Sequence, residues 1–172
     1  MTAPSDNPFF SLDELLSFRL THLTNSMNKI AAVSIDEEFG LALSEWQVLA
    51  SIGETGHSSV MGIARRTRID KGWISRASQS LLKRGLIARK ADPQDSRRAW
   101  LTLTEEGRLL FNRAAVTSQA RNATYIEELS PGEQLLLTEL LDKVQRRVDR
   151  FVLDPRSETE PASEASTEPH SS

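Results

Sequence analysis

The sequence predicts a mainly helical α+β fold, with a helix-turn-helix and one β-hairpin between longer helices at the two ends of the chain. Helix capping signals precede several segments whose apolar residues recur every three or four positions. A short helical segment at 60–67 is followed at once by a second helix, and two short apolar runs flank a Pro/Asp turn at 92–95. The expected order is therefore two helices, a helix-turn-helix, a hairpin and two helices.

The composition limits the classes of protein that remain. The chain has 172 residues, of which 38% are hydrophobic and 26% charged, and it contains no cysteine. These values are typical of a folded soluble protein, and the lack of cysteine excludes disulfides, thiolate metal sites and cysteine nucleophiles. No apolar run approaches the ~20 residues of a membrane span, and the first ten residues do not resemble a signal peptide. We therefore expect a cytoplasmic protein with no membrane partner.

Two helices are predicted before the helix-turn-helix. The first covers 11–40, where Ser11 and Glu14 are placed as a capping box and a glycine ends the apolar repeat. The second is expected to begin at Ser44, with Gln47 completing its capping box.

The helix-turn-helix is predicted after a turn at 53–59. A short helix covers 60–67, and Asp70 caps a longer helix that stops at Gly85. The strands of the hairpin are expected at 86–90 and 99–103.

Two further helices complete the prediction. Thr104 caps a helix that runs toward Ile126. The segment from Ser130 to Glu133 combines a cap, a first-turn proline and a capping box at the start of the last helix. The first and last helices both carry broad apolar stripes, and stripes so far apart in sequence indicate an intertwined dimer.

The charge of the chain is unevenly distributed. The net charge is −3, but residues 61–108 hold twelve Lys/Arg against five Asp/Glu, which leaves +7 there and −10 elsewhere. A basic middle between acidic ends is the electrostatic pattern of a nucleic-acid-binding segment.

The helix that begins after Asp70 has an apolar face and a polar face. Its inward positions are Ile74, Ala77 and Leu81. An α-helix fits the major groove of DNA, where its N-terminal half meets the base edges. On the polar face, Ser75, Arg76 and Gln79 can hydrogen-bond to bases, since Arg reads guanine and Gln reads adenine with two bonds.

Cations around that face are candidates for phosphate contacts, which position a protein on DNA without reading its sequence. They are Arg65, Arg66, Arg68, Lys71, Lys83 and Arg84. The alternative interpretation is an ordinary solvated basic helix.

The tip of the predicted hairpin carries two further cations. Arg97 and Arg98 follow the turn, and a tip of this kind can enter a narrow minor groove. Asp95 can orient the Arg97 guanidinium through an ion pair, although an ordinary surface pair of this kind contributes under about 1 kcal/mol.

Four segments together resemble the MarR family of winged-helix regulators: 43–49, 71–86, 92–97 and 103–107. The most specific part is the pattern Asp-Pro-x-Asp-x-Arg followed by Leu-Thr-x-x-Gly. The resemblance covers roughly residues 11–152. It implies a homodimer that represses its own or neighbouring genes and releases DNA when a small, often aromatic, anionic ligand binds.

The resemblance also implies a domain organisation for residues 11–152 and site residues. The tail after residue 153 is expected to be disordered because of its composition, which is rich in Pro, Ser, Thr, Glu and Ala and has no apolar periodicity. The winged helix-turn-helix domain is expected between N- and C-terminal dimerisation helices. The ranges are a flexible N-terminus (1–10), an N-terminal dimerisation helix (11–40), the DNA-binding domain (41–104), C-terminal dimerisation helices (105–153) and a disordered acidic tail (154–172). Asp95 and Arg97 match the family's wing residues, and Ser75 and Arg76 match positions midway along its recognition helix.

Trp73 departs from the family pattern, which often has small polar residues near the start of the recognition helix. The indole is expected either on a thymine methyl or sugar edge of DNA, or packed against the neighbouring helix. Gln79 also stands where the family commonly has a charged residue, so the operator is expected to differ from those of better-known relatives.

The resemblance places an effector between the terminal helices and the DNA-binding domain. Arg19 and His22 share a helix face, and Arg19 can hold a carboxylate with two hydrogen bonds. Trp46 can form an aromatic wall. The alternatives are an exposed charge for Arg19, a partly buried residue with satisfied hydrogen bonds for His22 and a core residue for Trp46.

An enzyme is not expected, and no cofactor is implied. The chain has no Gly-rich phosphate loop and no His-x-x-x-His pair, and neither His22 nor His57 has an evident catalytic or metal partner in the sequence. The expected partners are double-stranded DNA, a second copy of the chain and a small aromatic carboxylate or phenol. The alternatives are a winged-helix module that binds a protein and a DNA-binding activator.

Overall fold

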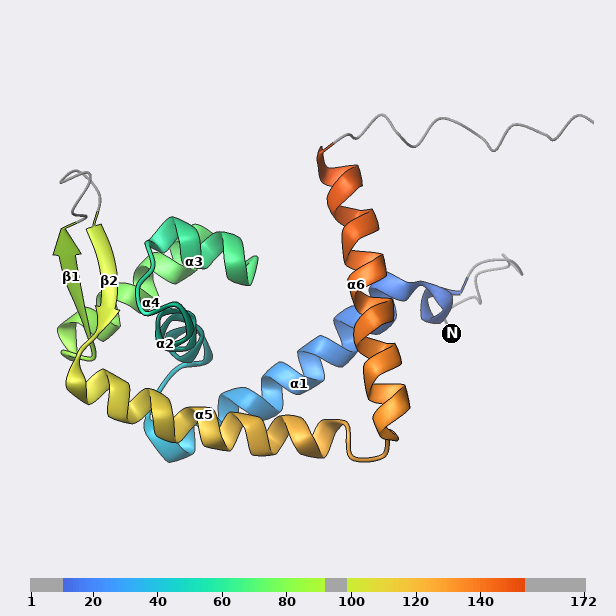
Figure 1. The fold of residues 1–172 in the computed structure, drawn as a ribbon, viewed down its shortest axis with the longest axis horizontal. Helices are drawn as coiled ribbons and strands as arrows, with labels where there is room; N and C mark the ends of the chain where they lie inside the picture. The colour runs from blue at the N-terminus through green and yellow to red at the C-terminus, as the bar shows by residue number, and fades with distance from the viewer. Residues whose placement is uncertain (1–10, 92–98, 154–172) are drawn as a thin grey trace, which may run out of the picture. The chain divides into compact units, whose positions relative to one another are not determined.

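The computed structural model describes residues 11–91 and 99–153 and has the predicted mainly helical, winged helix-turn-helix architecture (Figure 1). A short 3-10 turn, η1, precedes the first helix. The elements are η1 Leu12–Glu14, α1 Leu16–Phe39, α2 Leu43–Thr55, α3 Val60–Thr67, α4 Lys71–Lys83, β1 Ile87–Ala91, β2 Ala99–Leu103, α5 Glu105–Tyr125 and α6 Pro131–Leu153. The chain divides into two compact units, residues 1–121 and 122–172, and each is described by itself.

The start of α1 differs from the prediction. Ser11 makes no capping hydrogen bond through its side chain, and Leu15 has an extended backbone with ψ 121° that separates η1 from α1. A capping box at Ser11 is therefore wrong, because the chain is not helical at Leu15. The predicted end is confirmed, since Gly40 adopts the left-handed conformation with φ 60° that glycine tolerates best.

The start and end of α2 also differ from the prediction. The Glu45 carboxylate, not the Gln47 amide, closes the first turn by accepting from the Ala42 N–H at 2.8 Å. The helix then continues through Gly53, so the predicted turn at 53–59 begins too early. The Phe111 ring lies against Gly53 inside the helix, where a Cβ would come within 2.6 Å of the ring, so this position has room only for glycine.

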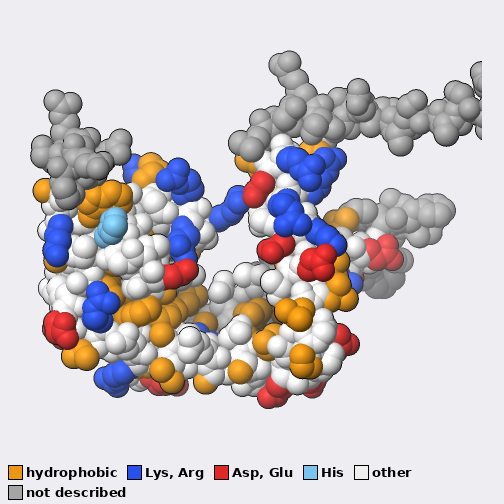
Figure 2. Space-filling view, in the orientation of Figure 1, with side chains coloured by type: hydrophobic (Ala, Val, Ile, Leu, Met, Phe, Trp, Pro, Cys, Tyr) orange, Lys and Arg blue, Asp and Glu red, His pale blue; other side chains and the backbone are white. Residues whose placement is uncertain are grey.

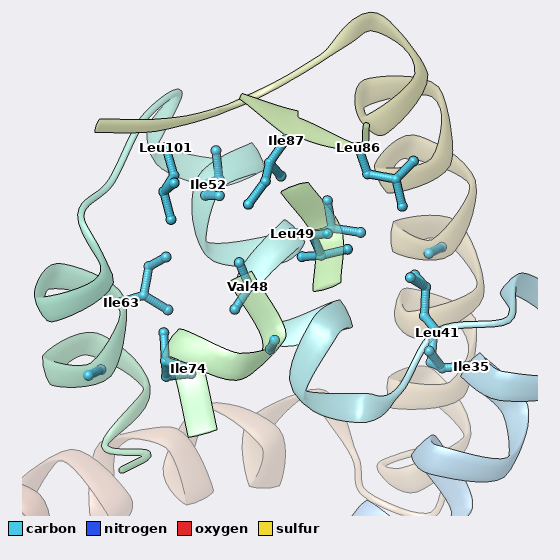
Figure 3. Packing of buried hydrophobic residues seen from close by; sticks show 14 residues of the cluster. Ile35, Leu41, Val48, Leu49, Ile52, Ile63, Ile74, Leu86, Ile87 and Leu101 are labelled. Atoms are coloured by element: carbon cyan, nitrogen blue, oxygen red, sulfur yellow. The ribbon is translucent and has the colours of Figure 1, made fainter. Parts of the chain in front are cut away.

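The lobe formed by α2, α3, α4 and the hairpin encloses the core. Helix α2 packs against α3, α4 and β2, and α4 packs against β1. Figure 3 shows side chains from these elements and from the end of α1 turned toward a common interior. The largest fully buried side chains of the core are Ile35, Leu41, Val48, Leu49, Ile52, Ile63, Ile74 and Leu81. The core thus holds the helix-turn-helix and the hairpin together.

Local caps fix the ends of the lobe's elements as predicted. The Asp70 carboxylate accepts from the backbone N–H groups of Gly72 and Trp73 at 2.8 and 3.3 Å. At the start of α5, the Thr104 hydroxyl oxygen accepts from the Gly107 N–H at 3.0 Å. Gly107 also lies so close to the strand that a Cβ there would be 1.8 Å from the Leu86 carbonyl oxygen. Helix α5 and the hairpin are therefore joined through backbone contact.

The second unit consists of the end of α5, a turn and α6. The predicted capping box is confirmed: the Ser130 N–H donates to the Glu133 carboxylate at 2.8 Å, and the Ser130 hydroxyl donates to it at 2.7 Å. These bonds, the hydroxyl bond first, lower the pKa of the Glu133 carboxyl below its ordinary value.

The surface of α6 is divided along its length. Lys and Arg side chains gather toward its C-terminal end and hydrophobic side chains toward its other half (Figure 2). No residue from 131 to 152 is buried. The large exposed apolar residues of α6 are Leu135, Leu136, Leu137, Leu140, Leu141, Val148 and Val152.

Candidate functional site

The candidate site is the solvent-facing side of α4. The helix buries Ile74, Ala77 and Leu81, as the sequence predicts, and also Ser78, whose hydroxyl donates to the Ile74 carbonyl at 2.8 Å. The predicted base-reading residues lie on the other side: Arg76 and Gln79 are exposed and Ser75 is half-buried. The packing of one face therefore presents these three side chains outward together.

Trp73 and Arg76 form a pair on this outward face. Trp73 keeps 59% of its surface exposed. The Arg76 Cζ lies 4.7 Å from the centroid of the Trp73 ring, within the range of a cation–π contact. The sequence predicts Trp73 and Arg76 as two separate contacts with DNA. Their i, i+3 spacing, which makes side chains neighbours on a helix, is the signal that points to the pair.

Several predicted phosphate contacts are exposed around α4. Arg65, Arg68, Lys71 and Lys83 are all exposed. Arg66 is exposed as well, and its guanidinium forms a surface ion pair with Glu54 of α2. Figure 2 shows Lys and Arg side chains spread over the lobe that these elements form.

Arg84, also predicted as a phosphate contact, is exposed but is held by two interactions within the protein. Its guanidinium donates to the Gly40 carbonyl at 3.0 Å and to the Glu45 carboxylate at 3.2 Å. Glu45 is buried, with 7% of its surface exposed, and it also caps α2. Arg84 therefore ties the end of α4 to the junction between α1 and α2. The sequence gives no local signal for this contact because its partners are about forty residues away.

The hairpin that follows α4 is antiparallel, with Ile87 opposite Leu103 and Ala91 opposite Ala99. Ser58, before α3, exchanges two backbone hydrogen bonds with Leu101 at 3.0 and 2.8 Å. Asp95, Arg97 and Arg98, which the sequence places at the hairpin tip, lie outside the described residues.

A ring contact lies beside the last described pairs of the hairpin, where Trp100 is opposite Lys90. The His57 and Trp100 rings meet edge to face, with centroids 4.7 Å apart. His57 lies in the loop between α2 and α3, so the contact joins residues far apart in the sequence, which no local pattern indicates.

The candidate effector residues do not all lie together. Arg19 and His22 line one open cavity with Phe18 and Asp13, with a volume of about 370 Å³. Both are exposed, so His22 is not the partly buried residue of the alternative interpretation. Trp46 lies elsewhere: it packs against the core and stacks on Phe111 at 6.0 Å between ring centroids. The structure thus brings Arg19 and His22 together and separates Trp46 from them.

Other classes of site find no support in the described part of the chain. No group of three or more His, Asp or Glu side chains is arranged to hold a metal ion in residues 11–91 and 99–153. In the same ranges, no helix is both long and apolar enough to cross a membrane.

Comparison with known proteins places this arrangement in a family. The model of the MarR family matches residues 39–98, which include α2, α3, α4 and β1. The HTH-type transcriptional regulator BilQ of Clostridium symbiosum is 30% identical over 105 residues, which cover 61% of this chain and 73% of BilQ. The HTH-type transcriptional repressor MdtR of Bacillus subtilis is 27% identical over 141 residues, which cover 81% of this chain and 91% of MdtR.

Solved structures share the fold. A MarR/EmrR-family regulator from Acinetobacter sp. ADP1 superposes with a TM-score of 0.76 at 24% identity, covering 82% of this chain and 99% of that one. A MarR-family regulator of Listeria monocytogenes, solved with a 26-mer DNA, has a TM-score of 0.75 at 21% identity and covers 87% and 99%. BpsR of Bordetella bronchiseptica, whose DNA binding is regulated by 6-hydroxynicotinic acid, has a TM-score of 0.70 at 24% identity and covers 79% and 96%. The proteins from Acinetobacter and Listeria, like BilQ and MdtR, are described as transcriptional regulators or repressors.

Proposed function

Because the chain belongs to the MarR family of transcriptional regulators, we propose that it is a homodimeric, sequence-specific repressor that a small aromatic or phenolic acid releases from a pseudo-palindromic operator. The observation that carries the proposal is the outward face of α4, where Ser75, Arg76 and Gln79 lie opposite a buried apolar face. In a dimer, two such helices enter successive major grooves ~34 Å apart. Arg97 and Arg98 then reach the flanking minor grooves, with Asp95 orienting Arg97.

Similarity to other proteins supports the finer parts of this proposal. MdtR is a repressor, the Listeria regulator was solved with DNA, and BpsR responds to an aromatic acid. The exposed leucines of α6 supply an apolar surface that a second copy of the chain can cover. Arg19 and His22 supply a cation and an imidazole to one cavity, where an aromatic carboxylate fits their chemistry.

The experiment that tests the proposal is fluorescence anisotropy of the purified protein across a range of salt concentrations. The probes are its own upstream promoter DNA and a scrambled duplex of the same length. Tight, salt-dependent binding to the promoter alone supports a sequence-specific regulator. Equal weak binding to both probes, and to duplexes selected from random DNA, contradicts it and favours a module that binds a protein.

Two variants separate base reading from phosphate contact. Arg76→Ala is expected to weaken binding to the operator more than to random DNA. Lys83→Ala is expected to weaken binding to all sequences alike and to reduce the salt dependence. Equal losses on operator and random DNA for Arg76→Ala contradict its base-reading role.

The effector is tested by isothermal titration with a panel of aromatic carboxylates and phenols. Binding is expected for at least one acid and is expected to weaken in Arg19→Ala and His22→Ala. An acid that binds and lowers the affinity for DNA supports the proposed release, because only a ligand that prefers the released conformation shifts the equilibrium. Binding that does not change in Arg19→Ala contradicts this site.

A further inference from the structure

Trp73 differs in its exposure from the other large apolar side chains of α4. Its neighbour Ile74 is fully buried, as is Leu81, whereas Trp73 remains 59% exposed. Trp73 lines an open pocket with Leu43 and Ile69, so it lies beside the start of α2 without being enclosed. The indole therefore contributes little to the core, and its position on the outward face needs another explanation.

The contact with Arg76 supplies that explanation. The Arg76 guanidinium lies over the Trp73 ring at 4.7 Å, and its Nη1 is 3.6 Å from where a Cβ on Gly72 would stand. The arginine side chain is thus folded back over the first turn of α4, the direction in which helical side chains lean. A recognition helix meets base edges with this N-terminal part.

A guanidinium that lies over an aromatic ring can still read a base. When one face of the planar group rests on a ring, the N–H donors point outward in the plane of the group and stay available. Two of those donors match the O6 and N7 acceptors of guanine. The stack also restricts a long, flexible side chain before DNA arrives, so less rotamer entropy is lost when the base contact forms.

We propose that Trp73 is a positioning residue that holds Arg76 for reading one guanine in each half-site of the operator. The inference rests on the proposed function, because it concerns how the DNA-binding face selects its sequence. Trp73 acts through Arg76 and not through its own contact with a base, which distinguishes this role from an indole on a thymine methyl group.

The free protein gives the first test. In an NMR spectrum, the Arg76 Nε–H resonance is expected to be shifted upfield by the ring current of Trp73. Trp73→Phe keeps an aromatic face and is expected to retain part of the shift, whereas Trp73→Leu, which is apolar but has no π face, is expected to lose it. An Arg76 resonance that is the same in wild type and Trp73→Leu overturns the pair.

Binding to DNA gives the decisive test. The wild-type protein selects an operator from random duplexes, and each guanine of that operator is then replaced by 7-deazaguanine, which lacks the N7 acceptor. Replacing one guanine in each half-site is expected to lower the affinity of the wild-type protein about tenfold. The same replacement is expected to leave the affinity of Arg76→Ala unchanged. Trp73→Leu is expected to reduce this discrimination by about threefold to fivefold, and Trp73→Phe by less than about twofold.

Two further comparisons separate positioning from direct contact. In an Arg76→Ala background, Trp73→Leu is expected to cause no additional loss at that guanine, because its effect passes through Arg76. Lys83→Ala is the matched control from the same helix, expected to lower affinity for every duplex without changing the discrimination.

The possible failures are distinct. The positioning role is wrong if Trp73→Leu distinguishes guanine from 7-deazaguanine as well as wild type does. It is also wrong if Trp73→Leu lowers the affinity at that guanine by the same factor in the Arg76→Ala background. In both cases the proposed function stands. If the wild-type protein enriches no sequence, the proposed function and the positioning role fail together.

Discussion

The lobe of α2, α3, α4 and the hairpin and the helix α6 both have apolar faces, but only the lobe buries them. In the lobe, Leu49, Ile52 and Leu81 have no exposed surface. In α6, Leu135 is 75% exposed and no residue from 131 to 152 is buried. The lobe, together with residues of α1 and α5, therefore covers its own core, whereas the leucines of α6 need a surface supplied from elsewhere. The contrast shows that helical periodicity identifies an apolar face without identifying what packs on it.

The largest expected effect contrasts a leucine from each region. Leu49→Ala is expected to lower the free energy of unfolding by about 2–5 kcal/mol, because it removes buried methyl groups and leaves a cavity. Chemical denaturation followed by circular dichroism measures this. Leu135→Ala is the matched variant in α6: at low protein concentration its effect is expected to stay below about 0.5 kcal/mol. A large, concentration-independent loss in Leu135→Ala contradicts the comparison.

A second contrast concerns two glycines in the first turns of helices. Gly107→Ala is expected to lower the free energy of unfolding by about 1–3 kcal/mol, because the new Cβ meets the Leu86 carbonyl. Gly132→Ala in α6 meets nothing within 4 Å, and alanine favours a helix, so stability is expected to rise by up to about 1 kcal/mol. Thermal melts of the two variants check both signs. Equal effects indicate that Gly107 is not at a tight backbone approach.

A third contrast concerns two ion pairs within the lobe's own unit. Glu45→Ala is expected to cost about 1–2 kcal/mol, because it removes the α2 cap and leaves the Arg84 guanidinium without its carboxylate partner. Glu54→Ala breaks an exposed pair with Arg66 and is expected to cost under about 1 kcal/mol. Denaturant titrations at low and high salt measure both. Similar costs for the two variants show that burial of Glu45 adds nothing.

The smallest expected effect is a change in pKa at the start of α6. The pKa of Glu133 is lowered in the folded protein, chiefly by the Ser130 hydroxyl, so its ionised form stabilises the fold at pH values above ~4.3, the usual pKa of an unfolded glutamate. That stabilisation is lost as the pH falls through the lowered pKa. Ser130→Ala is expected to raise the pKa of Glu133 toward its ordinary value, and Ser130→Thr to keep it low. An NMR titration of the Glu133 side chain decides between these outcomes.

Short-range signals in the sequence were sufficient for much of the fold. The Asp70 cap, the glycine ends at Gly40 and Gly85 and the box of Ser130 with Glu133 all depend on residues within a few positions of one another. Each was predicted as the structure shows it, because the hydrogen bonds involved are local.

The remaining features depend on partners far away in the chain. Glu45 replaces Gln47 at the α2 cap, where it also binds Arg84 of the α4 terminus. Gly53, which the sequence suggests as a turn, lies within α2 against Phe111 of α5, where a larger residue would clash. Trp46 stacks on the same Phe111 ring and does not line the cavity of Arg19 and His22. No spacing rule within one helix contains this information.

The exchange of backbone hydrogen bonds between Ser58 and Leu101 also bears on how the protein avoids aggregation. A two-stranded hairpin leaves unpaired N–H and C=O groups along its outer edges, and such edges are templates for strand addition by another molecule. At Leu101 both groups on the side away from β1 are already occupied by Ser58. An incoming strand therefore cannot pair with the centre of β2. The outer edge of β2 is interrupted at Leu101, which disfavours strand addition between molecules at high concentration.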